Sequence, residues 1–115
     1  MRREIVFAPQ AAEDEKRLRA NERATVRDKI QRHLRHDATK TSKSRVKRLR
    51  GLNQPQYRLR VDDIRVFYDV NQEAVEILAI VPKAEAVEWL ERYGKPAPEQ
   101  ELADPTQTNK EGGKS

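Results

Sequence analysis

The sequence predicts an α+β domain in which two N-terminal helices and a C-terminal helix pack on a small antiparallel sheet, with the helices gathered on one face. Two runs near the middle of the chain alternate apolar and polar residues, as in a β-hairpin, and helical spacing precedes and follows them. The chain has 115 residues, of which 36% are hydrophobic and 37% charged, so it can form one domain with a small core. The expected order is strand, two helices, three strands, helix and tail.

The N-terminal part predicts one strand and two helices. Residues 4–8 form a short apolar run that ends at Pro9, and we expect residues 3–7 to be the strand. Pro9 lacks a backbone N–H for a ladder but fits the first turn of a helix. A helical pattern then covers residues 10–20, and Asn21 is a suitable N-cap for a second helix. The apolar residues of that helix recur every four positions, at Val26, Ile30 and Leu34. We expect the two helices to be antiparallel.

The middle of the chain predicts a mobile loop followed by a hairpin. Residues 37–44 are polar and have no periodicity, which is typical of a loop. The two alternating runs, 57–61 and 64–70, flank Asp62-Asp63. A two-residue turn fits there because Asp tolerates a positive φ better than most residues.

The C-terminal part predicts a strand, a helix and a disordered tail. Residues 74–81 are apolar on both faces, as in an interior strand covered on both sides. Residues 83–93 have helical spacing and Gly94 follows them as a stop signal. The inward-facing residues of this helix are either Ala86, Leu90 and Tyr93, or Val87 and Leu90. We therefore expect a folded domain over residues 1–94 and a disordered tail over 95–115, which is rich in Pro and polar residues.

A basic stretch without any carboxylate separates Asp37 from Asp62. The net charge of +5 and the pI near 9.7 already favour a polyanionic partner. The stretch concentrates this charge in eight side chains: Lys40, Lys43, Arg45, Lys47, Arg48, Arg50, Arg58 and Arg60. Phosphate is the expected partner, because Lys and Arg that neutralise a nucleic-acid backbone release its condensed counterions.

The predicted hairpin register places Arg60 opposite Arg65 and Arg58 opposite Phe67. Like charges directly opposite each other cost on the order of 0.2–1 kcal/mol, so the arginines are expected to have another use. Three guanidinium groups around an aromatic ring can hold a phosphate and stack a base. The alternative is a solvated outer face whose charge is relieved by Asp63, Asp69 or Glu76. The opposite face is apolar and suits packing under the helices: Tyr57, Leu59, Val61, Ile64, Val66 and Tyr68.

The residues before the hairpin are expected to add RNA-binding contacts at the rim of this site. They are Arg45, Lys47, Arg48 and Arg50. The alternative is an ordinary solvated basic stretch. Trp89 on the last helix is expected in the core or against a partner, with stacking on a base as a further possibility.

Several kinds of chemistry have no signal in the sequence. The chain has no cysteine, which excludes disulfides and thiol catalysis. His33 and His36 fall near the end of the second helix, where a cation favours the helix dipole, and no residues have metal-ligand spacing. No run approaches the roughly 20 apolar residues of a spanning helix, and no signal peptide is recognisable. We expect a cytoplasmic protein that needs no metal or cofactor and contacts no membrane.

Four segments in this order resemble the RelE/ParE superfamily of toxins from bacterial type II toxin-antitoxin systems. They are KRLRG at 47–51, QYRLRV at 56–61, DIRVFYDV at 63–70 and the strand at 75–81. The resemblance implies a small α+β toxin held inactive by a cognate antitoxin. RelE-like members cleave mRNA in the ribosomal A site, whereas ParE-like members poison DNA gyrase.

The resemblance also implies site residues. Three basic positions of the ribonuclease branch align with Arg58, Arg60 and Arg65. That branch also uses an arginine after the last strand and a tyrosine near the C-terminus, where this chain has Ala84 and Leu90. Lys83 and Tyr93 are the nearest substitutes as proton carriers, and Glu85 is a further candidate. RNA cleavage needs such groups because an arginine, with a pKa above about 12, is a poor base.

The leading hypothesis is a toxin that is a ribosome-dependent mRNA interferase, an endoribonuclease that inhibits translation. The alternatives are a gyrase-poisoning toxin and a non-catalytic relative that only binds RNA or the antitoxin. The expected partners are mRNA on the ribosome and a cognate antitoxin, whose amphipathic segment would offer acidic side chains to the basic groove.

Overall fold

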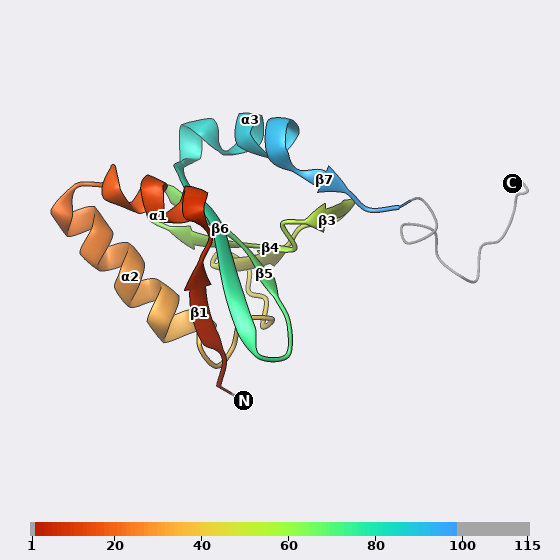
Figure 1. Ribbon diagram of the computed structural model, residues 1–115, viewed down its shortest axis with the longest axis horizontal. Helices are drawn as coiled ribbons and strands as arrows, with labels where there is room; N and C mark the ends of the chain where they lie inside the picture. The colour runs from red at the N-terminus through yellow and green to blue at the C-terminus, as the bar shows by residue number, and fades with distance from the viewer. Residues whose placement is uncertain (1, 99–115) are drawn as a thin grey trace, which may run out of the picture.

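The computed structural model describes residues 2–98 and confirms an α+β fold, with helices packed on a mixed sheet (Figure 1). None of the helices within this range is long and apolar enough to cross a membrane. In chain order the elements are β1 (Glu4–Phe7), α1 (Pro9–Lys16), α2 (Ala20–Leu34), β2 (Val46–Arg48), β3 (Leu52–Gln54), β4 (Tyr57–Val61), β5 (Ile64–Val70), β6 (Ala74–Pro82), α3 (Lys83–Tyr93) and β7 (Lys95–Pro96).

The main sheet has the strand order β1-β6-β5-β4-β2 and is mixed, not wholly antiparallel as predicted. Strand β1 runs parallel to β6, with Ile5 opposite Val75, and the other neighbours are antiparallel. A parallel pair of strands needs a long connection between them. Here the connection from β1 to β6 contains both N-terminal helices, the strands β2, β4 and β5 of the main sheet, and the short strand β3. The prediction that 74–81 form an interior strand is confirmed, because β6 has a partner on each side.

The structure contains three short strands that the sequence pattern did not predict. Strand β2 pairs with β4 at the edge of the main sheet, while β3 and β7 form a separate two-stranded sheet. Each has only two or three residues, too few to show a period. Ordered structure therefore extends past Gly94 to β7, and residues 99–115 of the expected tail lie outside the described residues.

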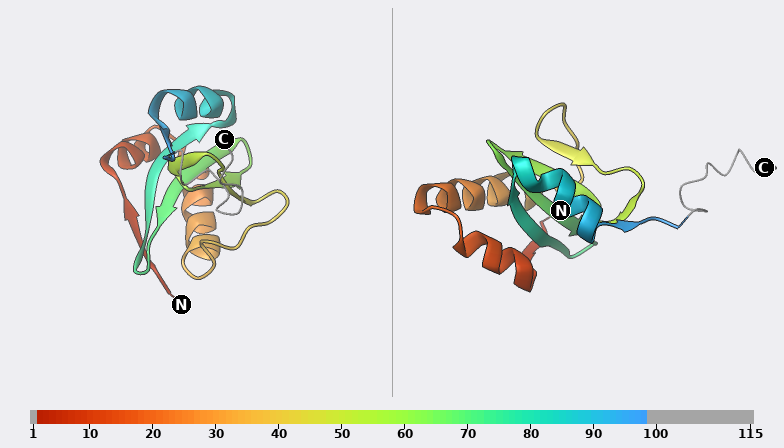
Figure 2. Two further views of the ribbon diagram at one scale, coloured as in Figure 1. Left: turned by 90° about the vertical axis from the view of Figure 1, so that its right-hand side faces the viewer. Right: turned by 90° about the horizontal axis from the view of Figure 1, so that it is seen from above.

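The two N-terminal helices differ from the prediction at their junction. Helix α1 ends at Lys16, and α2 already begins at Ala20, with Glu22 accepting a hydrogen bond from the N–H of Arg19 at 3.1 Å. Asn21 is therefore inside the first turn and is not the N-cap. Arg23 donates to backbone carbonyls at the end of α1, which fixes the turn between the helices. The helices diverge in an open V instead of running antiparallel (Figures 1 and 2).

Helices cover both faces of the sheet, not one. The apolar residues of α2 pack with the predicted apolar face of the hairpin in the main core: Val26, Ile30, Leu34, Leu59, Val61, Ile64, Val66 and Tyr68. Helix α3 lies on the opposite face, as Figures 1 and 2 show. It covers a second, smaller cluster formed by Phe67, Ala79 and Val81, against which Leu49, Ala86, Trp89 and Leu90 pack.

A buried carboxylate fastens α1 to β6 beyond the end of β1. Strand β1 stops opposite Ile77, so the N–H of Ile80 has no strand partner on that side. Asp14 accepts this N–H at 3.0 Å and also accepts from Gln10 and Arg17. The sheet edge is thus satisfied by a side chain, as buried backbone groups require.

The loop after α2 is anchored by the core. Ala38 is fully buried, and its carbonyl accepts a hydrogen bond from the Tyr68 hydroxyl at 2.7 Å. The Tyr68 ring is also fully buried and stacks on Tyr57, with ring centroids 5.4 Å apart. Burial is the main reason why the pKa of Tyr68 lies well above its usual value of 10.0.

We expect Tyr68→Phe to cost about 1–2 kcal/mol in the free energy of unfolding, because the buried Ala38 carbonyl loses its donor. The wild type should also lose stability as pH rises above about 10, since the unfolded chain releases the Tyr68 proton while the folded chain retains it. Urea unfolding at pH 8 and near pH 10.5 measures both effects. The exposed Tyr93→Phe is the control; an equal loss of stability at high pH in Tyr68→Phe would contradict the assignment.

Candidate nucleic-acid interface

The hairpin register agrees with the prediction. Arg60 lies opposite Arg65 and Arg58 opposite Phe67. Asp62 takes the positive φ of 52° that a two-residue turn requires, in agreement with the expectation for Asp62-Asp63. The arginines therefore project from one side of the sheet, the side that α3 partly covers.

Strand β2 adds one side chain to this basic surface and places the predicted rim residues Lys47 and Arg48 on opposite sides of the sheet. Lys47 is opposite Arg58, so both side chains lie on the same side of the sheet. Arg48 is opposite Tyr57 and lies with its guanidinium carbon 5.2 Å from the centre of that ring, on the α2 side. We use the name basic face for Lys47, Arg58, Arg60 and Arg65.

Arg45 and Arg50 flank β2. Both are exposed, and the carbonyl of Arg45 accepts a hydrogen bond from the N–H of Arg60 at 2.8 Å. Arg45 is therefore held beside Arg60, whereas Arg50 lies in the turn that follows β2.

Arg58 is half-buried and only partly satisfied. Its Nη2 lies 3.5 Å from the Ser44 carbonyl, while its Nε is buried without an acceptor in the described structure. Burial lowers the pKa of Arg58, and the neighbouring Arg65 and Arg60 lower it further. This arrangement costs free energy in the folded state, because a buried unpaired donor keeps its desolvation penalty.

Arg65 is more buried than a phosphate-binding residue was expected to be. Its side chain is 7% exposed, and its Nη1 donates to the carbonyls of Asp62 at 2.8 Å and Ile64 at 3.1 Å. Burial and then Arg60 lower its pKa. Arg65 therefore braces the turn and places positive charge beneath the surface, while Arg60 is exposed.

No carboxylate within residues 2–98 forms an ion pair with the basic face. The ion pairs of this range involve only residues of α1, α2 and α3 and Arg17, which directly follows α1. Asp69 instead accepts from the side chain of Gln54 and the N–H of Gln56, and Asp63 is only the weakest influence on the pKa of Arg65. The basic face thus presents unneutralised cations.

Phe67 does not offer its ring to a base. It is fully buried, and Trp89 stacks on it with centroids 5.0 Å apart and planes inclined by 7°. The expected stacking platform is therefore an internal contact, because α3 covers this part of the sheet. Trp89 packs against the second core cluster, which agrees with the prediction of a core position.

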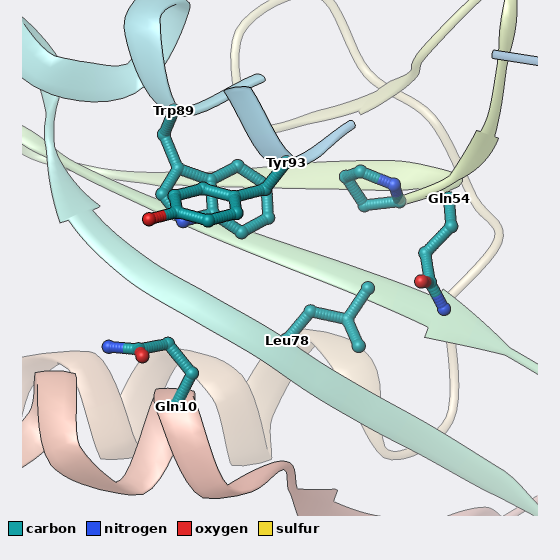
Figure 3. A pocket seen from close by; sticks show the side chains of 6 residues that line it. Gln10, Gln54, Leu78, Trp89 and Tyr93 are labelled. Atoms are coloured by element: carbon teal, nitrogen blue, oxygen red, sulfur yellow. The ribbon is translucent and has the colours of Figure 1, made fainter. Parts of the chain in front are cut away.

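The two expected proton carriers lie at opposite ends of α3. Lys83 begins the helix beside the hairpin turn, where its N–H donates to the Asp63 carbonyl at 2.7 Å. Tyr93 ends it, 56% exposed, with its ring beside Trp89 over a pocket that Leu78 also lines (Figure 3). A helix of 11 residues is about 16 Å long. Lys83 is thus near the basic face and Tyr93 is not, and residues 2–98 contain no cluster of three metal-ligating side chains.

The family of the chain follows from its sequence. A model of the ParE toxin of type II toxin-antitoxin systems (parDE) matches residues 5–87. The chain belongs to this family. The match begins at the second residue of β1, covers α1, α2 and the other strands of the main sheet, and ends within α3. No curated protein matches the chain in sequence.

Solved toxin structures share the fold of this ParE-family toxin. A chain of the archaeal RelE–RelB complex of Pyrococcus horikoshii has 23% identity and a TM-score of 0.59, and the match covers 72% of this chain and 97% of that chain. A RelE mutant of E. coli in the free state has 21% identity and a TM-score of 0.59, covering 79% and 93%. The RelBE2 complex of Mycobacterium tuberculosis contains a chain with 19% identity and a TM-score of 0.59, covering 71% and 99%.

Proposed function

We propose that this toxin acts on RNA, as a ribosome-dependent mRNA interferase whose basic face holds the scissile phosphate. The observation that carries the proposal is the absence, within residues 2–98, of any carboxylate paired with Lys47, Arg58, Arg60 or Arg65. A surface of unneutralised cations has its strongest interactions with a polyanion, and phosphate contacts position a nucleic acid without reading its sequence.

The basic face can supply charge stabilisation in this reaction. RNA cleavage transfers the proton of the ribose 2′-hydroxyl to a base while the 2′-oxygen attacks the phosphorus, and the bond to the 5′-oxygen then breaks as that oxygen takes up a proton. Between these events the phosphate carries additional negative charge, which preorganised donors stabilise. Arg58 and Arg60 are positioned to donate to its oxygens, and Arg65 adds positive potential from below. Of the two expected proton carriers, Lys83 lies closer to this face than Tyr93.

We also propose that a cognate antitoxin covers the basic face. The solved relatives with RelB or RelBE2 in their names are antitoxin-toxin complexes. Acidic side chains of an antitoxin segment would pair with Lys47, Arg58 and Arg60, which lack carboxylate partners within the described range.

A gyrase-directed toxin is the second candidate, and two observations favour it. The matching family model is that of ParE, whose members the resemblance associates with gyrase poisoning. Ala84 and Leu90 also occupy the positions at which the ribonuclease branch has an arginine and a tyrosine. Such a toxin would need binding surfaces but no proton carrier.

Induced expression without an antitoxin separates the two candidates. We expect incorporation of labelled amino acid to fall within minutes and before incorporation of labelled thymidine, with new mRNA 5′ ends inside translated regions. Arg92→Ala is the control and should behave as the wild type, because Arg92 is exposed and paired with Glu88. Filamentation and an early arrest of DNA synthesis would favour the gyrase candidate, and unchanged growth would overturn both.

A further inference from the structure

A basic pocket beside the basic face lies where α2 meets the segment before β2 and the end of β4. It has a volume of about 220 Å³ and is formed by the C-terminal half of α2, the segment before β2 and the end of β4: Lys29, His33, Ser44, Arg45, Arg60, Val61 and Asp62. Its three segments are far apart in sequence. Arg60 connects it with the basic face, because Arg60 contributes to both.

The pocket is fixed in place by hydrogen bonds. The Ser42 hydroxyl accepts from the N–H of Arg45 at 2.9 Å and of Val46 at 3.2 Å, which shapes the segment before β2. The N–H of Arg60 donates to the Arg45 carbonyl at 2.8 Å, which joins this segment to β4. Arg45 and Arg60 thus come from a constrained backbone, and Lys29 and His33 come from α2.

The charge of the pocket favours an anion. Lys29, Arg45 and Arg60 form no ion pair within residues 2–98, and Asp62 is the one carboxylate among the lining residues. Two positive charges therefore remain when His33 is neutral. A phosphodiester, with one negative charge and two free oxygens, matches such a set of donors.

His33 makes the pocket sensitive to pH. Burial lowers the pKa of His33, and the positive charges of Arg45, Lys29 and Arg32 lower it further. The negative charge of Asp28 raises this pKa by a smaller amount. Two other charged residues, Arg60 and Asp62, line the same pocket. The lowered pKa favours the neutral imidazole when no ligand is bound. A bound anion would favour the protonated form, and by linkage protonation would strengthen anion binding.

We propose that this pocket is a second phosphodiester subsite, so that single-stranded RNA passes from the basic face over Arg60 to Lys29, His33 and Arg45. The inference rests on the proposed action on RNA and specifies where the strand continues. Two adjacent subsites favour a polymer over free phosphate, because the second contact is intramolecular once the first has formed.

The test is the affinity of the full chain for a short single-stranded RNA oligonucleotide, measured by fluorescence anisotropy over a salt series. Lys29→Gln and Arg45→Gln should each weaken binding about three- to tenfold and reduce the slope of log K against log salt by about 0.7. Lys16→Gln, an exposed lysine of α1 paired with Glu13, removes the same charge elsewhere and should have little effect.

The pH dependence gives an independent measurement. Wild-type affinity should rise between pH 7.5 and pH 5.5, and His33→Gln should flatten this rise without unfolding the protein. Inorganic phosphate should compete only weakly. The subsite is overturned if Lys29→Gln and Arg45→Gln match Lys16→Gln while Arg58→Gln weakens binding. If Arg58→Gln has no effect either, the proposed action on RNA fails as well.

Discussion

Replacing Arg58 with methionine is expected to abolish toxicity while leaving the protein at least as stable as the wild type. Arg58 occupies the position on β4 between Lys47 on β2 and the covered Phe67 on β5. If it stabilises the charge that develops on the phosphate, its removal should lower the cleavage rate about 10²- to 10³-fold, as the loss of one preorganised donor does elsewhere.

Stability should move in the opposite direction from activity. Arg58 has a buried Nε without an acceptor, and Arg65 and Arg60 lie near enough to lower its pKa. Methionine keeps the apolar stem of the side chain and removes both the unpaired donor and the repulsion. A residue retained for folding would show a loss of stability on the same change, so the pair of measurements separates a functional arginine from a structural one.

Three measurements test this prediction: growth after induction, cleavage of a defined mRNA in a reconstituted translation system, and urea unfolding. Arg92→Met is the matched control, since Arg92 is exposed on α3 and pairs with Glu88 at 3.3 Å. Arg58→Lys keeps the charge without the forked donors, and we expect it to be intermediate. A variant Arg58→Met that unfolds more easily but remains toxic would contradict the assignment on both counts.

The parts of the fold that depend on local chemistry could be read from the sequence. Alternation on both sides of Asp62-Asp63 defines the hairpin register, because a slip of one residue would place Leu59 and Val66 on the wrong face. The helix from Lys83 to Tyr93 could also be predicted, since Pro82 and Gly94 bound its periodic pattern. Local signals of this kind need no knowledge of what packs against them.

The remaining features depend on contacts between distant segments. Phe67 shares its face of β5 with Arg65 and Asp69, so the sequence pattern alone assigns it to a polar face, and only the position of α3 shows that it is covered. The pocket beside His33 has no sequence motif, because it forms only where α2 meets the segment before β2.

Phe67→Ala is expected to cost about 3–5 kcal/mol in the free energy of unfolding, the range for a fully buried phenylalanine. Phe67 is the largest of the three buried residues in the small cluster that attaches α3, and Trp89 stacks on its ring with centroids 5.0 Å apart. Without the ring, Ala79 and Val81 offer α3 little apolar surface. The loss should therefore loosen α3 as well as lower global stability.

Trp89 reports this loosening directly, because it is the single tryptophan of the chain. Its emission should shift to longer wavelength in Phe67→Ala before any urea is added, as the indole becomes exposed to water, and the urea midpoint should fall. Phe67→Leu should restore most of the stability because it refills much of the space. Val87→Ala, on the same helix but 68% exposed, should change the free energy of unfolding by less than about 0.5 kcal/mol. An unshifted emission together with a loss below about 1 kcal/mol would mean that α3 is held to the sheet by other contacts than the Phe67–Trp89 stack.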